Sequence, residues 1–173
     1  MRERYRCIAR VQKSHGKRGE VVAVPVHGLP AVLAEGLDVC VVPPQLKGER
    51  WRTVVSCYED DRGGSLIALS GIDDIGSAKK LAGRYLLARE GDLPDDLDLH
   101  DVDRLLGREV EDAALGMRGQ IVEVMRGVAN DVWVIDAQGE EVLLPVVEHV
   151  VADVPAQGPI SVNAKGFLGL GRR

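Results

Sequence analysis

Short hydrophobic runs with frequent polar alternation, each ended by turn-forming residues, fill the first half of the chain. Six runs have the length of strands: Arg4–Gln12, Glu20–Val26, Asp38–Val42, Trp51–Tyr58, Ser65–Leu69 and Arg84–Ala88. Turn signals stand between them, including Ser14-His15-Gly16 and Pro43-Pro44. Strands at this spacing, separated by glycine and proline, are typical of a small closed β-barrel.

One stretch of the first half favours a helix. Asp73 or Asp74 can cap its start, apolar positions follow from Ile75, and Gly83 stands where a glycine commonly ends a helix. The apolar face is too short for an independent helix. We therefore expect this helix to plug one end of the barrel.

The second half returns to strand-like runs: Leu105–Val110, Gly119–Arg126, Val132–Asp136, Glu141–Leu144 and Ile160–Val162. Residues 146–151 fit either a short helical turn or an edge strand. The pattern predicts an all-β (mainly β) fold of two small domains, with one or two short helices.

An acidic stretch separates the two halves. Residues 90–103 contain seven acidic residues and no lysine or arginine. Repulsion between the like charges and the presence of Pro94 favour an extended linker. A carboxylate cluster for a metal is the alternative, but the acids lack the alternating, glycine-centred spacing of a calcium loop. We expect domains at 1–90 and 104–173, a linker over 91–103, and no metal site.

The composition sets further bounds. Only six of 173 residues are aromatic, so few rings remain for stacking against nucleic-acid bases. Three widely spaced cysteines, Cys7, Cys40 and Cys57, form no CxxC pair and are interpreted as small buried hydrophobes. No apolar run reaches the roughly 18 residues of a membrane span, and no signal peptide is recognisable. We expect a cytosolic protein.

The net charge of −5 hides a strong asymmetry. Residues 1–89 hold 15 Lys/Arg against 10 Asp/Glu, whereas residues 90–173 hold 7 against 17. Because charge placement governs the choice of partners more than the fold, this split predicts an interaction role.

Catalytic motifs are not recognisable in the sequence. The four histidines, His15, His27, His100 and His149, stand in different local settings, and no nucleophile elbow, zinc-protease motif or phosphate loop occurs. Helix capping explains the acid pair Asp73-Asp74 more simply than acid–base chemistry does. The sequence predicts a binding protein rather than an enzyme, with no cofactor and no small-molecule substrate.

The segment from Lys13 to Glu20 is the strongest candidate site. Two glycines three residues apart allow a turn with positive φ that exposes backbone N–H groups. The first 18 residues hold seven basic side chains and one acid. Cationic side chains and free amides together suit RNA phosphates. The candidate RNA-binding residues are Lys13, His15, Gly16, Lys17, Arg18 and Gly19. A hairpin turn with ordinary solvated charges is the open alternative.

A second candidate lies at Asn130-Asp131-Val132-Trp133. Asn-Asp favours a turn, and the strand that follows is apolar on both faces. A bulky side chain could therefore remain near the surface, and Trp133 could anchor a protein partner. Burial of Trp133 in the core is the alternative.

Taken together, these stretches resemble the RimM family of bacterial ribosome maturation factors. The first half matches through an opening strand with a His-Gly-x-x-Gly-Glu loop (residues 8–21) and through the helix that ends in Leu-x-Gly (residues 70–85). The second half resembles a PRC-barrel domain. Its matching stretches are residues 105–110, 119–122, 130–134, 142–147 and 162–168. The match runs in order along nearly the whole chain.

The resemblance implies an N-terminal barrel of the translation-factor kind, followed by a PRC barrel. It implies a chaperone-like factor that binds the head of the immature 30S subunit, contacts 16S rRNA and promotes its processing. The PRC half is expected to hold small-subunit ribosomal protein nineteen. Candidate residues for that partner are His100, Asp101, Asn130, Asp131, Trp133 and Pro145. We expect a monomer without membrane association.

Two departures from the family pattern stand out. His100 and Asp101 occupy positions where family members often carry a tyrosine pair. Lys17 replaces the usual aliphatic residue and makes the loop more basic. A general RNA-binding barrel and a PRC-barrel sensor of small molecules remain as alternative functions.

Overall fold

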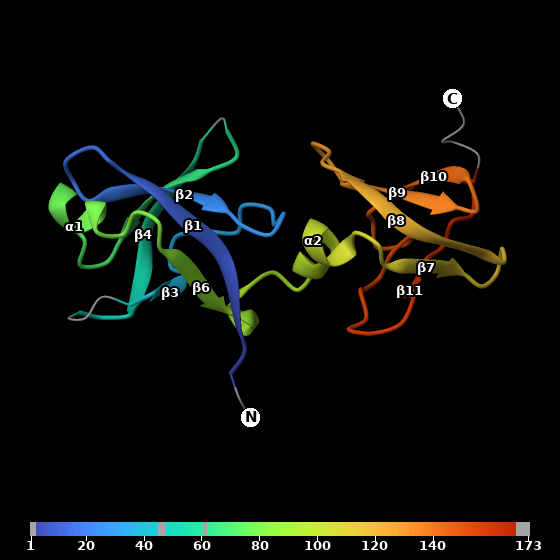
Figure 1. The fold of residues 1–173 in the computed structure, drawn as a ribbon, viewed down its shortest axis with the longest axis horizontal. Coiled ribbons are helices and arrows are strands. Elements are labelled where there is room, and N and C mark those ends of the chain that lie inside the picture. Colours follow the sequence, from blue (N-terminus) through green and yellow to red (C-terminus); the bar gives the residue numbers. More distant parts are fainter. Residues whose placement is uncertain (1–2, 45–47, 61, 169–173) are drawn as a thin grey trace. The chain divides into compact units, whose positions relative to one another are not determined.

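Strands dominate the computed structural model, which describes residues 3–44, 48–60 and 62–168 (Figure 1). They make up 43% of the described residues, and helices make up 10%, so the predicted mainly β class is confirmed. The chain divides into two units, Met1–Pro94 and Asp95–Arg173, called here the first and second domains. Within the described ranges, no helix has the length and apolar character needed to cross a membrane.

The first domain is a closed barrel of six antiparallel strands. They are β1 (Tyr5–His15), β2 (Glu20–Pro25), β3 (Asp38–Val42), β4 (Trp51–Glu59), β5 (Ser65–Leu69) and β6 (Tyr85–Arg89). Their order is β1-β2-β5-β4-β3-β6, and β6 pairs back onto β1. Alternate side chains such as Val11, Ile67 and Leu86 point inward and are fully buried, as the sequence pattern predicted.

The first turn lies later in the chain than the sequence predicted. β1 continues through Ser14 and His15, which pair with Val21 and Glu20 of β2. The turn therefore occupies Gly16–Gly19 rather than Ser14–Gly16. Strand pairing satisfies the backbone groups of Ser14 and His15, and this outweighs the local turn preference of serine.

The short helix α1 (Ile75–Lys79) packs against β1 and β2. Asp74 caps it by accepting a hydrogen bond from the Ser77 N–H at 2.9 Å. Gly83 (φ +81°) lies beyond the end of α1 and does not cap it. Its N–H instead donates to the Val11 carbonyl of β1 at 2.8 Å.

The acidic segment is folded rather than extended. It contains two 3-10 turns, η1 (Glu90–Asp92) and η2 (Leu97–His100), and the start of helix α2 (Val102–Leu105). Three leucines explain the difference from the expected linker. Leu93, Leu97 and Leu105 are 8%, 3% and 0% exposed, and burial of apolar side chains offsets the repulsion between neighbouring carboxylates.

The second domain is built on a five-stranded sheet of order β10-β9-β8-β7-β11. Its strands are β7 (Glu109–Asp112), β8 (Met117–Met125), β9 (Val132–Ala137), β10 (Glu140–Pro145) and β11 (Ile160–Ser161). Only β11 runs parallel to its neighbour, β7. The first of these strands begins later than predicted, because Leu105 belongs to α2. Residues 146–151 form a turn that ends in a single bridge between Val151 and Val162.

Candidate functional site

The β1–β2 hairpin carries the candidate RNA-binding residues. Gly16 and Gly19 both have positive φ, +61° and +86°, as the sequence predicted. Gly19 is also required sterically, because a Cβ there would overlap the backbone carbonyl of Ile72. The turn is therefore pressed against the segment that leads into α1, and its backbone is held in place.

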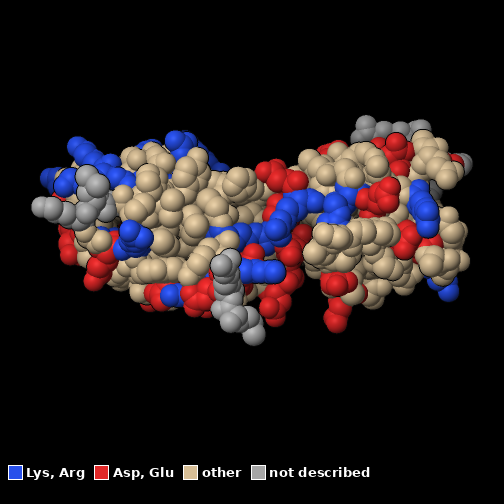
Figure 2. Space-filling view, turned by 60° about the horizontal axis from the view of Figure 1, so that its bottom comes forward, with Lys and Arg blue, Asp and Glu red and all other residues tan. Residues whose placement is uncertain are grey.

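The cationic side chains of this hairpin face solvent. Lys13, His15, Lys17 and Arg18 are all exposed. In the part of the chain that the structure describes, no carboxylate forms an ion pair with Lys13, Lys17 or Arg18. Figure 2 shows lysine and arginine side chains gathered at the end of the first domain that carries α1 in Figure 1. Arg2, counted among the seven basic residues, lies outside the described residues. The hairpin thus presents positive charge that its own domain does not neutralise.

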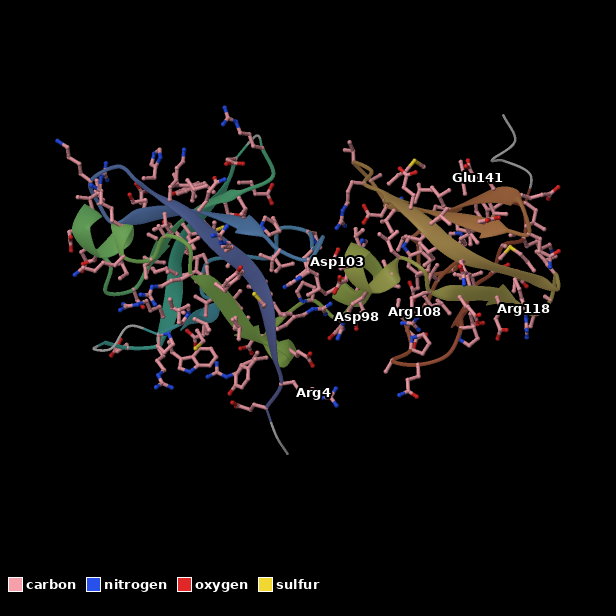
Figure 3. The ribbon with its side chains drawn as sticks, in the orientation of Figure 1. Arg4, Asp98, Asp103, Arg108, Arg118 and Glu141 are labelled. Carbon is pink, nitrogen blue, oxygen red and sulfur yellow. The ribbon has the colours of Figure 1, made fainter. Side chains whose placement is uncertain are left out.

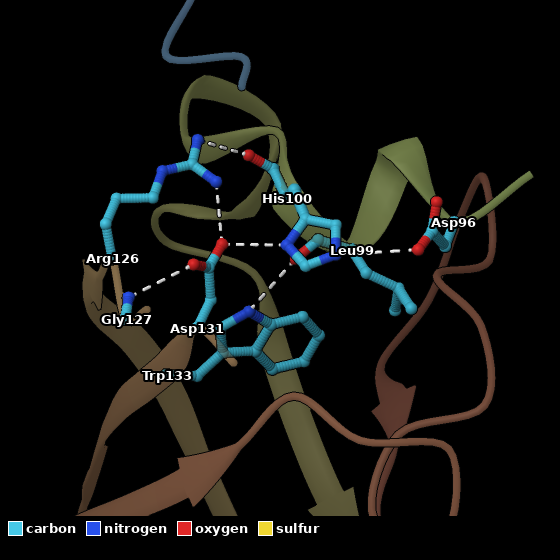
Figure 4. A network of polar contacts seen from close by, with 7 residues as sticks. All are labelled: Asp96, Leu99, His100, Arg126, Gly127, Asp131 and Trp133. Atoms are coloured by element: carbon cyan, nitrogen blue, oxygen red, sulfur yellow. Dashed lines mark hydrogen bonds and ion pairs between the residues drawn. The ribbon is translucent and has the colours of Figure 1, made fainter. Parts of the chain in front are cut away.

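In the second domain, the candidates His100 and Asp131 meet in a polar network (Figure 4). His100 Nδ1 lies 2.7 Å from Asp131 Oδ2. The same oxygen accepts a hydrogen bond from Arg126 Nη1 at 2.6 Å, and Arg126 Nη2 donates to the His100 carbonyl at 2.8 Å. The network joins η2 to both sides of the loop that connects β8 and β9.

Asp131 is only 6% exposed, yet it remains a carboxylate. Burial by itself would raise its pKa, but the His100 hydrogen bond, the charge of Arg126 and the Gly127 N–H together hold the pKa below its usual value. A charged carboxylate can only accept hydrogen bonds, so His100 donates from Nδ1. On its other side, His100 Nε2 lies 3.8 Å from Asp96.

Two predicted partner contacts are corrected by burial. Trp133 is fully buried in the core of the second domain, and its Nε1 donates to the Leu99 carbonyl at 3.3 Å. It cannot anchor a partner on the surface. Asp101 is 3% exposed and caps α2 by accepting from the Arg104 N–H at 3.2 Å, so its role is local as well.

A groove carries two of the remaining candidates. It has a volume of about 370 Å³, and both His100 and Asn130 line it. Pro145 is half-buried and directly precedes Val146, another lining residue. The other lining residues combine acidic and apolar side chains: Asp96, Leu99, Val147, Glu148, Val151 and Ala152. None of this second set was a sequence candidate, although Asp96 and Leu99 lie in the acidic segment and Val147 ends a stretch that matches the family.

Other polar side chains of the second domain have structural roles. Arg108, which precedes β7, donates from Nη2 to the carbonyls of Pro155 and Gly158 at 2.8 and 2.9 Å (Figure 3). Arg118 of β8 lies 3.4 Å from Glu111 of β7, which places opposite charges side by side. Arg108 thus binds the loop that contains Pro155 and Gly158, and Arg118 pairs with a side chain of the neighbouring strand.

The described residues contain no group of three or more His, Cys, Asp or Glu side chains that could hold a metal ion. The three cysteines are free and half-buried rather than fully buried. Burial raises the pKa of Cys7 and of Cys57, which keeps both as weakly reactive thiols.

Comparison with known proteins agrees with the division of the chain into two domains. The family model for the RimM N-terminal domain matches residues 6–93. The ribosome maturation factor RimM of Cutibacterium acnes is 34% identical over 94% of this chain and 89% of its own length. That of Thermoanaerobacter sp. (strain X514) is 28% identical over 91% of this chain and 94% of its own. A solved Pseudomonas aeruginosa structure, described as a 16S ribosomal RNA processing protein RimM, covers 92% of this chain and 97% of its own at 22% identity and a TM-score of 0.45.

The family model thus spans half of the chain, and the Cutibacterium relative matches nearly all of it. The chain belongs to the RimM family of ribosome maturation factors.

Proposed function

We propose that the chain is a non-enzymatic assembly factor that binds the head of the immature 30S subunit and promotes processing of its 16S rRNA. In this proposal the β1–β2 hairpin contacts rRNA phosphates. The second domain holds a basic ribosomal protein of the head, for which protein nineteen is the expected partner. The names of its relatives support a role in ribosome maturation. The observation that carries the RNA contact is the exposed charge of the hairpin, which forms no ion pair among the described residues.

The hairpin has the chemistry that phosphate binding requires. Lys13, Lys17 and Arg18 supply charge-assisted donors, and the fixed turn holds them on one rigid element. Each phosphate they neutralise releases counterions, so affinity should fall steeply with salt. Three contacts would contribute a slope of about −2 to −3 in log K against log salt concentration.

The groove of the second domain has complementary properties for a basic protein segment. Asp96 and Glu148 place carboxylates beside the apolar side chains of Leu99 and Val147. Apolar side chains can supply binding energy, while acidic ones select a cationic partner and speed its association. Residues 90–173 as a whole hold 17 acidic and 7 basic residues, which favours the same class of partner.

Charge reversal tests the RNA contact. The variant Lys13→Glu, Lys17→Glu, Arg18→Glu should bind immature small subunits more weakly, with a flatter salt dependence. The control Arg4→Glu, Arg50→Glu, Arg62→Glu changes the net charge equally at exposed positions outside the hairpin. Sedimentation with small subunits from cells that lack the factor measures both. Equal binding by the two triple variants would rule out a specific role of the hairpin.

A second reversal tests the protein contact. Glu148→Lys should weaken capture of purified ribosomal protein nineteen, because it places a cation at the groove. Glu141→Lys is the control, since Glu141 is exposed on β10 and does not line the groove. Undiminished capture by the Glu148→Lys variant would show that the partner contacts another part of the second domain.

A further inference from the structure

One aromatic side chain of the first barrel lies directly among arginines. Tyr85 begins β6 and pairs with Arg10 of β1 on one side and with Val42 of β3 on the other. Its side chain is 39% exposed, and Arg10 Cζ lies 5.9 Å from the ring centroid. This distance is at the outer limit of a cation–π contact, so Arg10 lies only loosely over the ring, which stays 39% exposed.

The neighbouring arginine is also available to an anion. Arg84 donates from Nε to the Lys80 carbonyl at 2.8 Å and from Nη1 to the Pro43 carbonyl. Both acceptors are neutral, so the positive charge of Arg84 is oriented but not cancelled. Across the described ranges, neither Arg10 nor Arg84 forms an ion pair with a carboxylate.

Hydrogen bonds connect this cluster to the β1–β2 hairpin. The Gly83 N–H donates to the Val11 carbonyl and the Val11 N–H donates to the Arg84 carbonyl, each at 2.8 Å. The start of β6 is thereby fixed beside β1, two residues before Lys13. We call the resulting surface the basic strip; it comprises Arg10, Lys13, Lys17, Arg18, Arg84 and Tyr85.

The other aromatic side chains of the first domain lack these properties. Arg89 lies 4.1 Å from the ring centroid of Trp51 and covers it. Tyr5 donates its hydroxyl to Glu3 at 2.5 Å. Tyr58 is exposed but directly precedes Glu59 and Asp60. Negative charge beside a ring disfavours a phosphate chain, so Tyr85 is the aromatic residue suited to a nucleic acid.

We propose that the basic strip binds single-stranded RNA, with one base stacked on Tyr85 and the flanking phosphates held by its arginines and lysines. The inference rests on the proposed RNA role of the first domain and specifies the form of RNA that it takes. An exposed ring can stack against any unpaired base, whereas a duplex keeps its bases inside the helix.

Oligonucleotide binding by the full chain tests this inference. The probes are a labelled single-stranded RNA of about ten nucleotides and the same strand annealed to its complement. Tyr85→Leu should bind the single strand about fivefold or more weakly than the unmodified chain, and duplex binding should not change. Tyr85→Phe should retain the affinity, since the ring remains. Tyr58→Leu removes a more exposed ring outside the strip (63% against 39% for Tyr85) and should have no effect.

Two results overturn the inference: single-strand affinity that does not depend on Tyr85, or an equal loss for the duplex. Both are distinguishable from failure of the proposed function. If hairpin charge reversal weakens binding to immature subunits while Tyr85→Leu changes no RNA affinity, only the single-strand inference fails. If that charge reversal leaves subunit binding unchanged, the RNA role of the first domain fails too.

Discussion

His100 Nδ1 lies 2.7 Å from the Asp131 carboxylate, although 31 positions separate the two residues in the chain. Arg126 binds the same carboxylate and the His100 carbonyl, so one buried charge fastens η2 to the β8–β9 hairpin. At His100 and Asp101 the family resemblance led us to expect a tyrosine pair. In this chain an ionic network occupies that place and shapes one side of the groove.

Asp131→Asn should therefore destabilise the second domain by about 2 kcal/mol, because it removes the charge that both His100 and Arg126 contact. Urea unfolding followed by Trp133 fluorescence, in a Trp51→Phe background, measures the change. Glu141→Gln alters an exposed carboxyl of the same domain and should change stability by less than about 0.5 kcal/mol. Equal stability of the two variants would contradict the importance of the network.

Acid should weaken the second domain through two carboxyls. The Ala164 N–H and two further backbone N–H groups lower the pKa of Asp112, against the opposing effect of burial. The pKa of Asp131 is also lowered. A carboxyl whose folded pKa is depressed contributes stability that is complete above the unfolded pKa, near 4, and is lost as the pH falls through the folded pKa. Between pH 7 and 5 these two groups should leave the stability unchanged.

Asp112→Asn tests this pH dependence separately from the network. Its unfolding free energy should fall less steeply below pH 4 than that of the unmodified chain, because one titrating group is gone. Urea titrations at several pH values measure the slope. A slope identical to that of the unmodified chain would show that Asp112 does not contribute to the loss of stability in acid.

Trp133 should act on stability rather than on recognition. Trp133→Ala should cost about 3–5 kcal/mol, the usual loss for a large buried aromatic residue, and calorimetry can measure it. A folded Trp133→Phe variant should capture ribosomal protein nineteen as well as the unmodified chain does. Reduced capture by that folded variant would show that the indole contributes to the interface indirectly.

Gly19 of the β1–β2 hairpin can be compared with Gly36, which has the same backbone conformation but lies outside the hairpin. Their φ values are +86° and +87°, but a Cβ at Gly19 would overlap the Ile72 carbonyl, whereas a Cβ at Gly36 meets no atom within 4 Å. Gly36→Ala should cost only the backbone strain, about 1 kcal/mol, and Gly19→Ala about 2 kcal/mol more. Hydrogen exchange over β1 and β2 should rise strongly in Gly19→Ala alone. Similar exchange in both variants would mean that the turn shifts to accommodate the new Cβ without weakening the pairing of β1 and β2.

The sequence was sufficient for most strands because alternation with a period of two reports which side chains face a core. It was insufficient where both faces are apolar. In β9, Trp133 and Ile135 are fully buried and Val134 is 4% exposed, so alternation alone could not orient the tryptophan. The acidic segment was misread for a related reason. It contains only two buried leucines, Leu93 and Leu97, and the charges around them dominated the pattern.

The two candidate sites differ in how far apart their residues lie in the chain. The basic hairpin is local, so consecutive residues revealed it. The groove and the polar network depend on pairs far apart in the chain, such as His100 with Asn130 and Arg126 with the His100 carbonyl. Tyr85 was likewise hidden, because only the pairing of β6 with β1 brings it beside Arg10.

The closure of the first barrel has a consequence during synthesis of the chain itself. The cationic hairpin is translated within the first 18 residues, but β1 gains its second neighbour only when β6, which ends at Arg89, has left the ribosome. A nascent chain shorter than this carries the charge without the fixed geometry. The selective RNA binding that we propose for the basic strip therefore has to wait for the completed barrel, whereas non-specific attraction to RNA would begin with the first residues to emerge.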